Sequence, residues 1–239
     1  MKKPLLIIST FAILLTACKK DKPISTNLTI DFTQTVDGEN LAMDNIQYTN
    51  AANQDYSVKR LWYIISDITL HKDNGTTNLL KEVHFIDASN PSTLSFEISD
   101  LEDGNYTSIS YKMGLDTAKN ISNLYVNEDF HATMFWPDMM GGGYHYMKLD
   151  GNFDNDSTFY NTHTGGTMGV DYSFENTNTI SLITDKTTSE ANITINMEVN
   201  NWYQNPNTIT LTTDEIMDSM EKQMKLKSNG ADVFSTTIN

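Results

Sequence analysis

The chain has 239 residues and a net charge of −15 at neutral pH, from 16 basic and 31 acidic side chains. This balance repels nucleic acid and anionic lipid headgroups, and no basic patch interleaved with aromatic residues counters it. Nucleic acid binding is therefore excluded. The length exceeds a typical domain of roughly 100 to 200 residues, but β-sandwiches reach it as one unit, and no repeat or low-complexity linker divides the chain.

The N-terminus is typical of a bacterial lipoprotein signal. Two lysines precede an apolar run at 5–15 that is too short to span a bilayer stably, and the run leads to Leu-Thr-Ala-Cys18. We expect removal of residues 1–17 and a tether at 18–26 that holds the protein, through lipidated Cys18, to a membrane of the bacterial cell envelope. The anchored protein would face the periplasm or lie on the outer membrane surface. Lipidation uses the only cysteine, which excludes a disulfide or thiolate ligand.

Within residues 27–239, four segments alternate apolar and polar side chains as half-buried strands do: 28–32, 94–98, 168–174 and 193–199. The turn signal Asp73-Asn74-Gly75 follows a longer apolar run, and Asp103-Gly104-Asn105 opens another strand. We predict one all-β domain, an antiparallel β-sandwich of Ig-like build with one C-terminal helix. The expected strands cover 28–32, 58–70, 94–98, 106–113, 168–174 and 193–199.

The expected helix begins near Thr212, whose hydroxyl can cap it with Glu215 three residues later. It runs to about Lys227, before Asn229-Gly230. An apolar stripe at three- and four-residue spacing is predicted to pack on the sheets, so its methionines are assigned to the core and not to a metal site. The stripe consists of Ile216, Met217, Met220 and Met224.

The densest cluster of soft metal ligands lies around the glycines at 141–143. Imidazole and thioether are donors that copper(I) prefers over hard divalent ions. The cluster therefore indicates a copper-binding protein. The candidate ligands are His163, His145, Met139, Met140, Trp136 and His131, with Met147 and Met168 in the same stretch.

Most of these ligands also have a structural interpretation. His145 shares strand parity with an apolar face, which equally predicts a core histidine. His163 precedes Gly165-Gly166, where a strand ends in a site-bearing loop, and is the strongest candidate. The loop methionines 139 and 140 could fill gaps, and Trp136 could be a core aromatic. The two remaining histidines, His71 and His84, are assigned surface or structural roles.

Seven short motifs follow one another along nearly all of the mature chain. They are Tyr63–Leu70 with Gly75; Phe85–Asp87; Gly104–Ile109 leading to Gly114–Asp116 and Asn120; Met134–Trp136; Gly143–Tyr144 with Lys148–Gly151; His163–Gly166; and Trp202 with Ala231–Phe234. In this order they resemble the MbnP-like family of bacterial periplasmic and surface proteins.

The resemblance implies a secreted β-sandwich that binds copper. In characterised relatives the ligands are a tryptophan oxidised to kynurenine and flanking histidines, which implies a di-haem oxidase as a partner. Kynurenine carries an aniline-type nitrogen that can ligate a metal, whereas an intact indole only donates a hydrogen bond. Some relatives have histidine two residues after the modified tryptophan, where this chain has Asp138 after Trp136. A plain His/Met site is therefore the simpler expectation.

No motif for catalysis is present: the chain lacks a Gly-x-Ser-x-Gly elbow, His-Glu-x-x-His and Cys-x-x-Cys. We therefore expect a non-enzyme. Three hypotheses remain. The first is a lipid-anchored copper-binding protein. The second is a metal-free surface module for carbohydrate or protein, which predicts exposed aromatics such as Trp62, Tyr144 or Trp202 in a groove. The third is an enzyme whose site carries no recognised motif.

Overall fold

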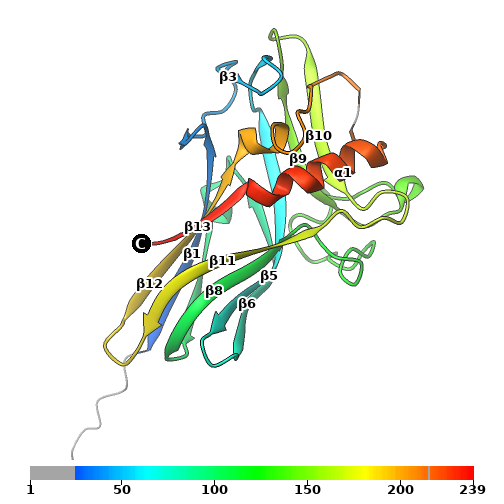
Figure 1. The fold of residues 1–239 in the computed structure, drawn as a ribbon. Coiled ribbons are helices and arrows are strands. Elements are labelled where there is room, and N and C mark those ends of the chain that lie inside the picture. The colour runs from blue at the N-terminus through cyan, green and yellow to red at the C-terminus, as the bar shows by residue number, and fades with distance from the viewer. Residues whose placement is uncertain (1–24, 215) are drawn as a thin grey trace, which may run out of the picture.

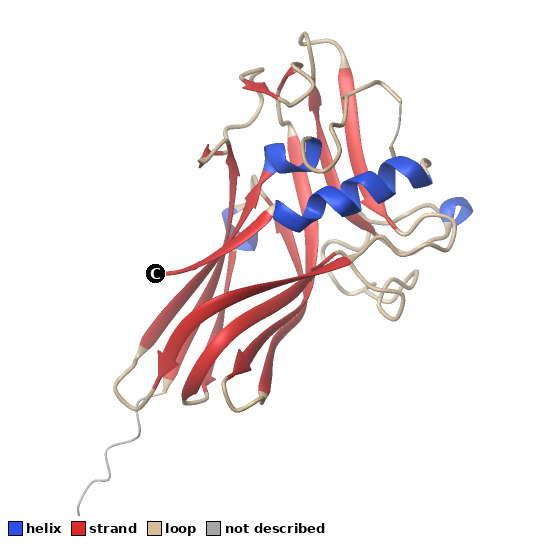
Figure 2. Cartoon of the chain, viewed as in Figure 1, coloured by secondary structure: helices blue, strands red, loops and turns tan. Residues whose placement is uncertain are grey.

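The structure, a computed structural model, describes residues 25–214 and 216–239. Two β-sheets pack against each other, and strands dominate the chain (Figures 1 and 2). This arrangement confirms the predicted all-β sandwich with one C-terminal helix. The predicted signal at 1–17 and lipidated Cys18 lie outside the described residues. Within the described ranges, no helix is long and apolar enough to cross a membrane.

The first sheet has the strand order β13-β12-β1-β2, with β7 paired to β1. β1 and β12 are parallel, with Ile30 opposite Ile193, while the other strand pairs of the described chain are antiparallel. A parallel pair needs a long crossover, which the intervening strands supply. The strands are β1 (Thr26–Val36), β2 (Glu39–Asn40), β7 (Ser95–Leu101), β12 (Glu190–Glu198) and β13 (Phe234–Ile238).

The second sheet has the order β10-β9-β5-β8-β11, with β6 paired to β5, so β10 is an edge strand. A two-stranded sheet pairs β3 (Tyr48–Thr49) with β4 (Asp55–Tyr56), and the 3-10 turns are η1 (Pro91–Thr93), η2 (Asp138–Met140), η3 (Val199–Tyr203) and η4 (Gly230–Asp232). The strands of the second sheet are β5 (Arg60–Lys72), β6 (Thr77–Asp87), β8 (Gly104–Met113), β9 (His145–Asn152), β10 (Phe159–Gly165) and β11 (Phe174–Thr184).

Side-chain alternation in the strands builds the core between the sheets. Leu28, Ile30 and Phe32 of β1 are buried, as their spacing predicts, and they join the same core cluster as Met147 and Leu149 of β9. Residues at alternate positions of one strand share a face, so the intervening side chains of β9 point out of the sandwich. The outward face of β9 and β10 is therefore the one available for a site.

The strand predicted at 168–174 is wrong over most of its length. Thr167 and Val170 form a bridge around Met168 and Gly169, which both have positive φ, and β11 begins only at Phe174. The alternation of apolar residues imitates a strand, but the glycine allows a tight turn within it.

The predicted helix lies in the right part of the chain, but its first residue and its buried face differ from the prediction. α1 spans Met220–Asn229, and the Ser219 side chain accepts a hydrogen bond from Lys222 N. Glu215, the predicted partner of Thr212, lies outside the described residues. Two members of the predicted stripe, Met220 and Met224, are exposed, while the helix buries Gln223, Leu226 and Asn229. Two polar residues replace methionine in the buried face because they bond to backbone groups of neighbouring segments.

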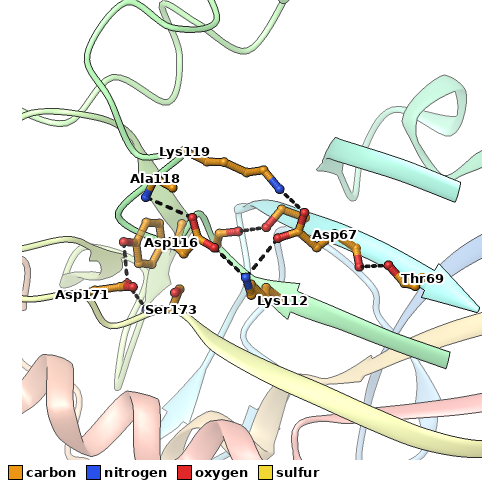
Figure 3. Close-up of polar contacts among 11 residues, drawn as sticks. Asp67, Thr69, Lys112, Asp116, Ala118, Lys119, Asp171 and Ser173 are labelled. Atoms are coloured by element: carbon orange, nitrogen blue, oxygen red, sulfur yellow. Dashed lines mark hydrogen bonds and ion pairs between the residues drawn. The ribbon is translucent and has the colours of Figure 1, made fainter. Parts of the chain in front are cut away.

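The long connection between β8 and β9, residues 114–144, carries Trp136 and is tied to the sheet by ion pairs. Figure 3 shows Asp67 of β5 between two lysines. Lys112 Nζ lies 3.1 Å from Asp67 Oδ2 and also contacts Asp116, and Lys119 pairs with Asp67 from within the connection. These contacts hold the first part of the connection against β5.

Candidate metal site

A β-bulge brings the two candidate histidines to the same face of the sheet. In the β9–β10 pair, His163 is opposite Lys148 and Thr164 is opposite Met147, but Gly165 is opposite His145. β9 therefore has one extra residue at this point, and the residues beyond it switch faces. His145 leaves the apolar face predicted from its parity and joins His163 on the outward face.

The two imidazoles lie against each other at this bulge. Their ring centroids are 5.1 Å apart with planes at 84°. His145 is buried, whereas 14% of the His163 side chain remains exposed. The pair is therefore closed to solvent on the His145 side and open beside His163.

Each ring directs one nitrogen to a protein acceptor. His145 Nδ1 lies 3.2 Å from the Met134 carbonyl oxygen, and His163 Nε2 lies 2.6 Å from Asp150 Oδ1. A carbonyl or carboxylate only accepts, which assigns the proton of the neutral ring to the bonded nitrogen. The other nitrogens, Nε2 of His145 and Nδ1 of His163, then keep a lone pair for a ligand.

Burial favours the neutral form of His145. Desolvation, with smaller effects from Lys148 and His163, lowers the pKa of His145 to about 3. A neutral imidazole is the form that binds metal ions. At neutral pH the His145 lone pair is therefore not lost to a proton.

Asp150 links His163 to the strand on the other side of β9. Its carboxylate accepts from His163 and forms an ion pair with Arg60, which is opposite Asp150 in the β5–β9 register. A carboxylate behind a histidine fixes the orientation of the ring and raises its basicity in metal sites. The sequence does not identify Asp150 as a partner of His163, because the two residues lie on different strands that only the fold brings together.

Trp136 covers the other side of His145. Its ring centroid is 4.6 Å from that of His145 at 70°, and its backbone N–H donates to Gly143 O. The ring also lies on Gly165: a Cβ there would be 2.6 Å from Trp136 Cε3. Trp136, His145 and His163 thus form one row of rings, in which His145 is central.

The indole nitrogen of Trp136 has no hydrogen-bond partner although it is buried. An unsatisfied buried donor is uncommon and calls for an explanation. Trp202 Nε1 is also buried without a hydrogen-bond partner, and Trp202 lies in the main core. The missing bond is therefore compatible with a modified or ligand-facing indole but does not by itself mark Trp136.

Helix α1 supports the site from the open edge of β10 (Figure 1). The Gln223 side chain is fully buried. Its Nε2 donates to His163 O at 2.8 Å, and its Oε1 accepts from Gly165 N at 3.4 Å. One amide side chain thus pairs with the edge strand as a neighbouring strand would. The sequence gives no motif for this contact.

The structure does not place the remaining candidates beside the two imidazoles. His131 Nδ1 lies 2.9 Å from the Tyr144 hydroxyl, at a second hydrophobic cluster. Met139 is exposed in η2, and Met140 is partly exposed beside it. The predicted six-residue site therefore separates into a His-His-Trp row, a supporting histidine and a methionine loop.

The other histidines have structural partners. His71 Nε2 lies 2.7 Å from Ser110 Oγ, and His84 is stacked on Phe32 with its Nε2 bonded to Thr93 O. Both agree with their expected surface or structural roles.

The aromatics expected to line a groove are mostly buried. Tyr144 and Trp202 are inaccessible, and only Trp62 contributes to an open groove, together with Arg60 and Phe159. Sequence hydropathy does not distinguish a buried ring from an exposed one in so aromatic a chain.

The donors present fit a metal of low coordination number. Within residues 25–214 and 216–239, no group of three or more His, Cys, Asp or Glu side chains could hold a metal ion. Two imidazoles fall short of the three or four protein ligands of ordinary zinc sites. They fit copper, for which imidazole is a suitable donor.

Comparisons with known proteins identify the family and the fold of the chain. The model of the MbnP family matches residues 25–237. Among solved structures, MbnP from Methylosinus trichosporium is similar, with a TM-score of 0.58 and 11% identity, over 89% of this chain and 98% of that one. At that identity the likeness shows the fold alone. No curated protein matches the chain. Because the family model covers most of its length, the chain belongs to the MbnP family.

Proposed function

We propose that this protein binds copper in the bacterial cell envelope and has no catalytic role of its own. The observation that supports this most is the row of rings on the outward face of β9 and β10. His145 and His163 converge there, and the ring nitrogens not bonded to Met134 O or Asp150 are Nε2 of His145 and Nδ1 of His163. These two nitrogens would hold the ion, and Asp150 would orient the second ring.

Trp136 would be a third ligand only after oxidation. The intact indole has no lone pair to give, whereas kynurenine carries an aniline-type nitrogen. Trp136 is the tryptophan that contacts His145, so it is the residue that a di-haem oxidase partner would modify. The unmodified chain would bind copper through the imidazoles alone, and more weakly.

A titration with copper(I) against a competing chelator tests the site. His145→Ala and His163→Ala should each weaken binding by more than about 100-fold, since outer-shell partners alone are worth roughly 10- to 100-fold. His71→Ala is the matched control, because His71 bonds to Ser110. Unchanged affinity in both site variants would contradict the proposal.

Mass spectrometry of protein taken from its own host tests the modification. We expect Trp136 to have gained one oxygen and lost one carbon there, and to be unmodified after expression without the partner oxidase. Trp202, also buried with an unpaired indole nitrogen, is the internal control. An unmodified Trp136 in the host protein would leave the plain two-histidine site.

The lipid anchor belongs to the same proposal. Cys18 would carry the lipid, and the acidic surface of the chain would itself be repelled by anionic headgroups. Cys18→Ala should therefore move the protein from the membrane fraction to the soluble fraction. Retention in the membrane fraction would exclude Cys18 as the anchor.

A second candidate function rests on the groove beside Asp150. Lys59, Arg60, Trp62 and Phe159 line it, with a volume of about 460 Å³. Exposed aromatic and charged side chains in a groove are typical of a surface that holds carbohydrate or protein. Glycan-array binding that persists without copper, and that falls in Phe159→Ala, would favour this function over the first.

A further inference from the structure

We propose that Met139 and Met168 form a second, solvent-facing site for a soft monovalent cation, copper(I) in the cell. This site is separate from the His145–His163 pair and does not require that pair to bind metal. It accounts for two exposed methionines that the fold itself does not explain.

Met168 stands at a backbone position that does not suit it. Its φ is +52° and that of Gly169 is +79°, and Thr167 and Val170 exchange two backbone hydrogen bonds around them, of 3.1 and 3.0 Å. Positive φ at both central positions defines a type I′ turn, where Asn-Gly is strongly preferred. Met168 therefore adds strain to the turn, and with 59% of it exposed it gains little packing in return.

Met139 is the most exposed of the large apolar side chains in the described chain, at 87%. It lies in η2, directly before Met140, Gly141 and Gly142. Methionine is usually a core residue, and one so exposed contributes almost nothing to hydrophobic stability. A thioether in water is, however, free to bind a soft ion.

The two turns touch, which places the segments that carry Met139 and Met168 side by side. Met168 N donates to Met140 O at 2.9 Å. A Cβ on Gly141 would be 3.6 Å from Met168 N and 3.7 Å from Gly169 N. Methionine has three rotatable bonds, so side chains from two touching turns can reach a common ion.

The surroundings favour a cation. A pocket of about 120 Å³ lies beside the two turns and is lined in part by Gly142, Gly169 and Asp171, while the two methionine side chains lie outside it. Asp138 adds a second carboxylate next to Met139. Met139 follows Trp136 by three positions, and Met168 follows Gly165, on which the Trp136 ring lies, by three. An ion held there would be next to the His145–His163 site.

The chain contains a matched pair that should not bind. Met220 and Met224 lie one turn apart on α1 and are each about half exposed, at 47% and 49%. Met220 is the first residue of the helix, where the helix dipole is positive, and two lysines lie beside the pair, Lys222 and Lys225, the second of which is paired with Glu221. Spacing and exposure are suitable at this pair, but the local charge is unfavourable.

Silver(I) titration of protein labelled at the methionine ε-methyl groups tests the proposal by NMR. The methyl signals of Met139 and Met168 should shift together with one equivalent, ahead of those of Met220 and Met224. Zinc should shift neither pair, since thioether selects soft ions. If the Met139 and Met168 signals move no earlier than those of the helix pair, or move at different equivalents, the site does not exist.

Substitution by leucine tests the same ligands without unfolding the protein, because both side chains are exposed. Met139→Leu and Met168→Leu should each weaken the affinity for the first equivalent of silver(I) by about tenfold or more. The control variant, with Met220→Leu and Met224→Leu combined, should leave that affinity unchanged. In His145→Ala the methionine signals should still shift, so a failed histidine site and a failed methionine site give different results. If the variant with both Met139→Leu and Met168→Leu still binds one equivalent of silver(I) with unchanged affinity, the proposal is overturned.

Discussion

The position of single rings decides whether the outward face can bind metal. His145 reaches His163 only because the bulge on β9 turns it out of the core, and Asp150 then fixes the second ring. Gly165 completes the arrangement by leaving space for Trp136. The site thus depends on a missing side chain as much as on the ligands.

Gly165→Ala should destabilise the protein by about 1 to 3 kcal/mol, because a methyl group there overlaps the Trp136 ring in a packed environment. Urea unfolding measures the change. In a Trp136→Phe background Gly165→Ala should cause a smaller loss of stability, since the larger part of the overlapping ring is gone. Equal losses in both backgrounds would show that the contact is not the cause.

His84 should make the protein sensitive to acid. Burial lowers the pKa of His84 to about 4, so between pH 6.5 and 4 the unfolded chain binds a proton that the folded chain does not. Stability is therefore lost as pH falls through this window. Between pH 7 and pH 5 the free energy of unfolding should fall on the order of 1 to 2 kcal/mol less in His84→Phe than in the unsubstituted protein. Urea unfolding at the two pH values measures it, and an unchanged pH dependence would contradict the assignment.

At the scale of elements, α1 stabilises the edge of the second sheet through one side chain. Gln223 donates to His163 O and accepts from Gly165 N, and both groups would otherwise be unpaired on an edge strand. The helix is thus part of the site's support, although its methionines face solvent.

Gln223→Leu should cost about 1 to 3 kcal/mol, the usual penalty for leaving buried polar groups unpaired, and should also weaken copper binding through His163. Met224→Leu on the exposed face of the same helix is the control. Stability comes from urea unfolding and affinity from the chelator titration. A variant with lower stability but unchanged copper affinity would limit Gln223 to a structural role.

At the Met168 turn, in contrast to the preceding sites, a substitution is expected to raise the stability of the protein. Met168→Asn should raise stability by about 0.5 to 1 kcal/mol, because asparagine tolerates positive φ in a type I′ turn better than methionine. Thermal unfolding without metal measures the gain. A loss of stability would mean that Met168 packs favourably in the folded protein, which would remove the reason for assigning it to a metal.

At the scale of the whole molecule, periodicity predicted the sandwich, because an alternating strand must bury one face. The parallel β1–β12 pair was not predictable, since strand direction depends on contacts about 160 residues apart. The turn at Met168 and the start of α1 were misjudged because apolar spacing is ambiguous over a few residues.

The candidate site was predictable in composition but not in arrangement. Soft donors between 131 and 168 identified His145, His163 and Trp136, and the structure brings these three together. Strand parity predicted the wrong face for His145, because a β-bulge cannot be recognised from the hydropathy pattern of one sequence. Gln223 and Asp150 were missed because each acts across strands or elements that only folding brings together.

Anomalous scattering at the copper edge, from crystals grown with one equivalent of copper(I), tests the central claim most directly. We expect one strong peak between His145 Nε2 and His163 Nδ1, next to the Trp136 ring, and its loss in His163→Ala crystals. A strong peak elsewhere with none between these two nitrogens, or no peak at all, would contradict the proposal that this protein binds copper through His145 and His163.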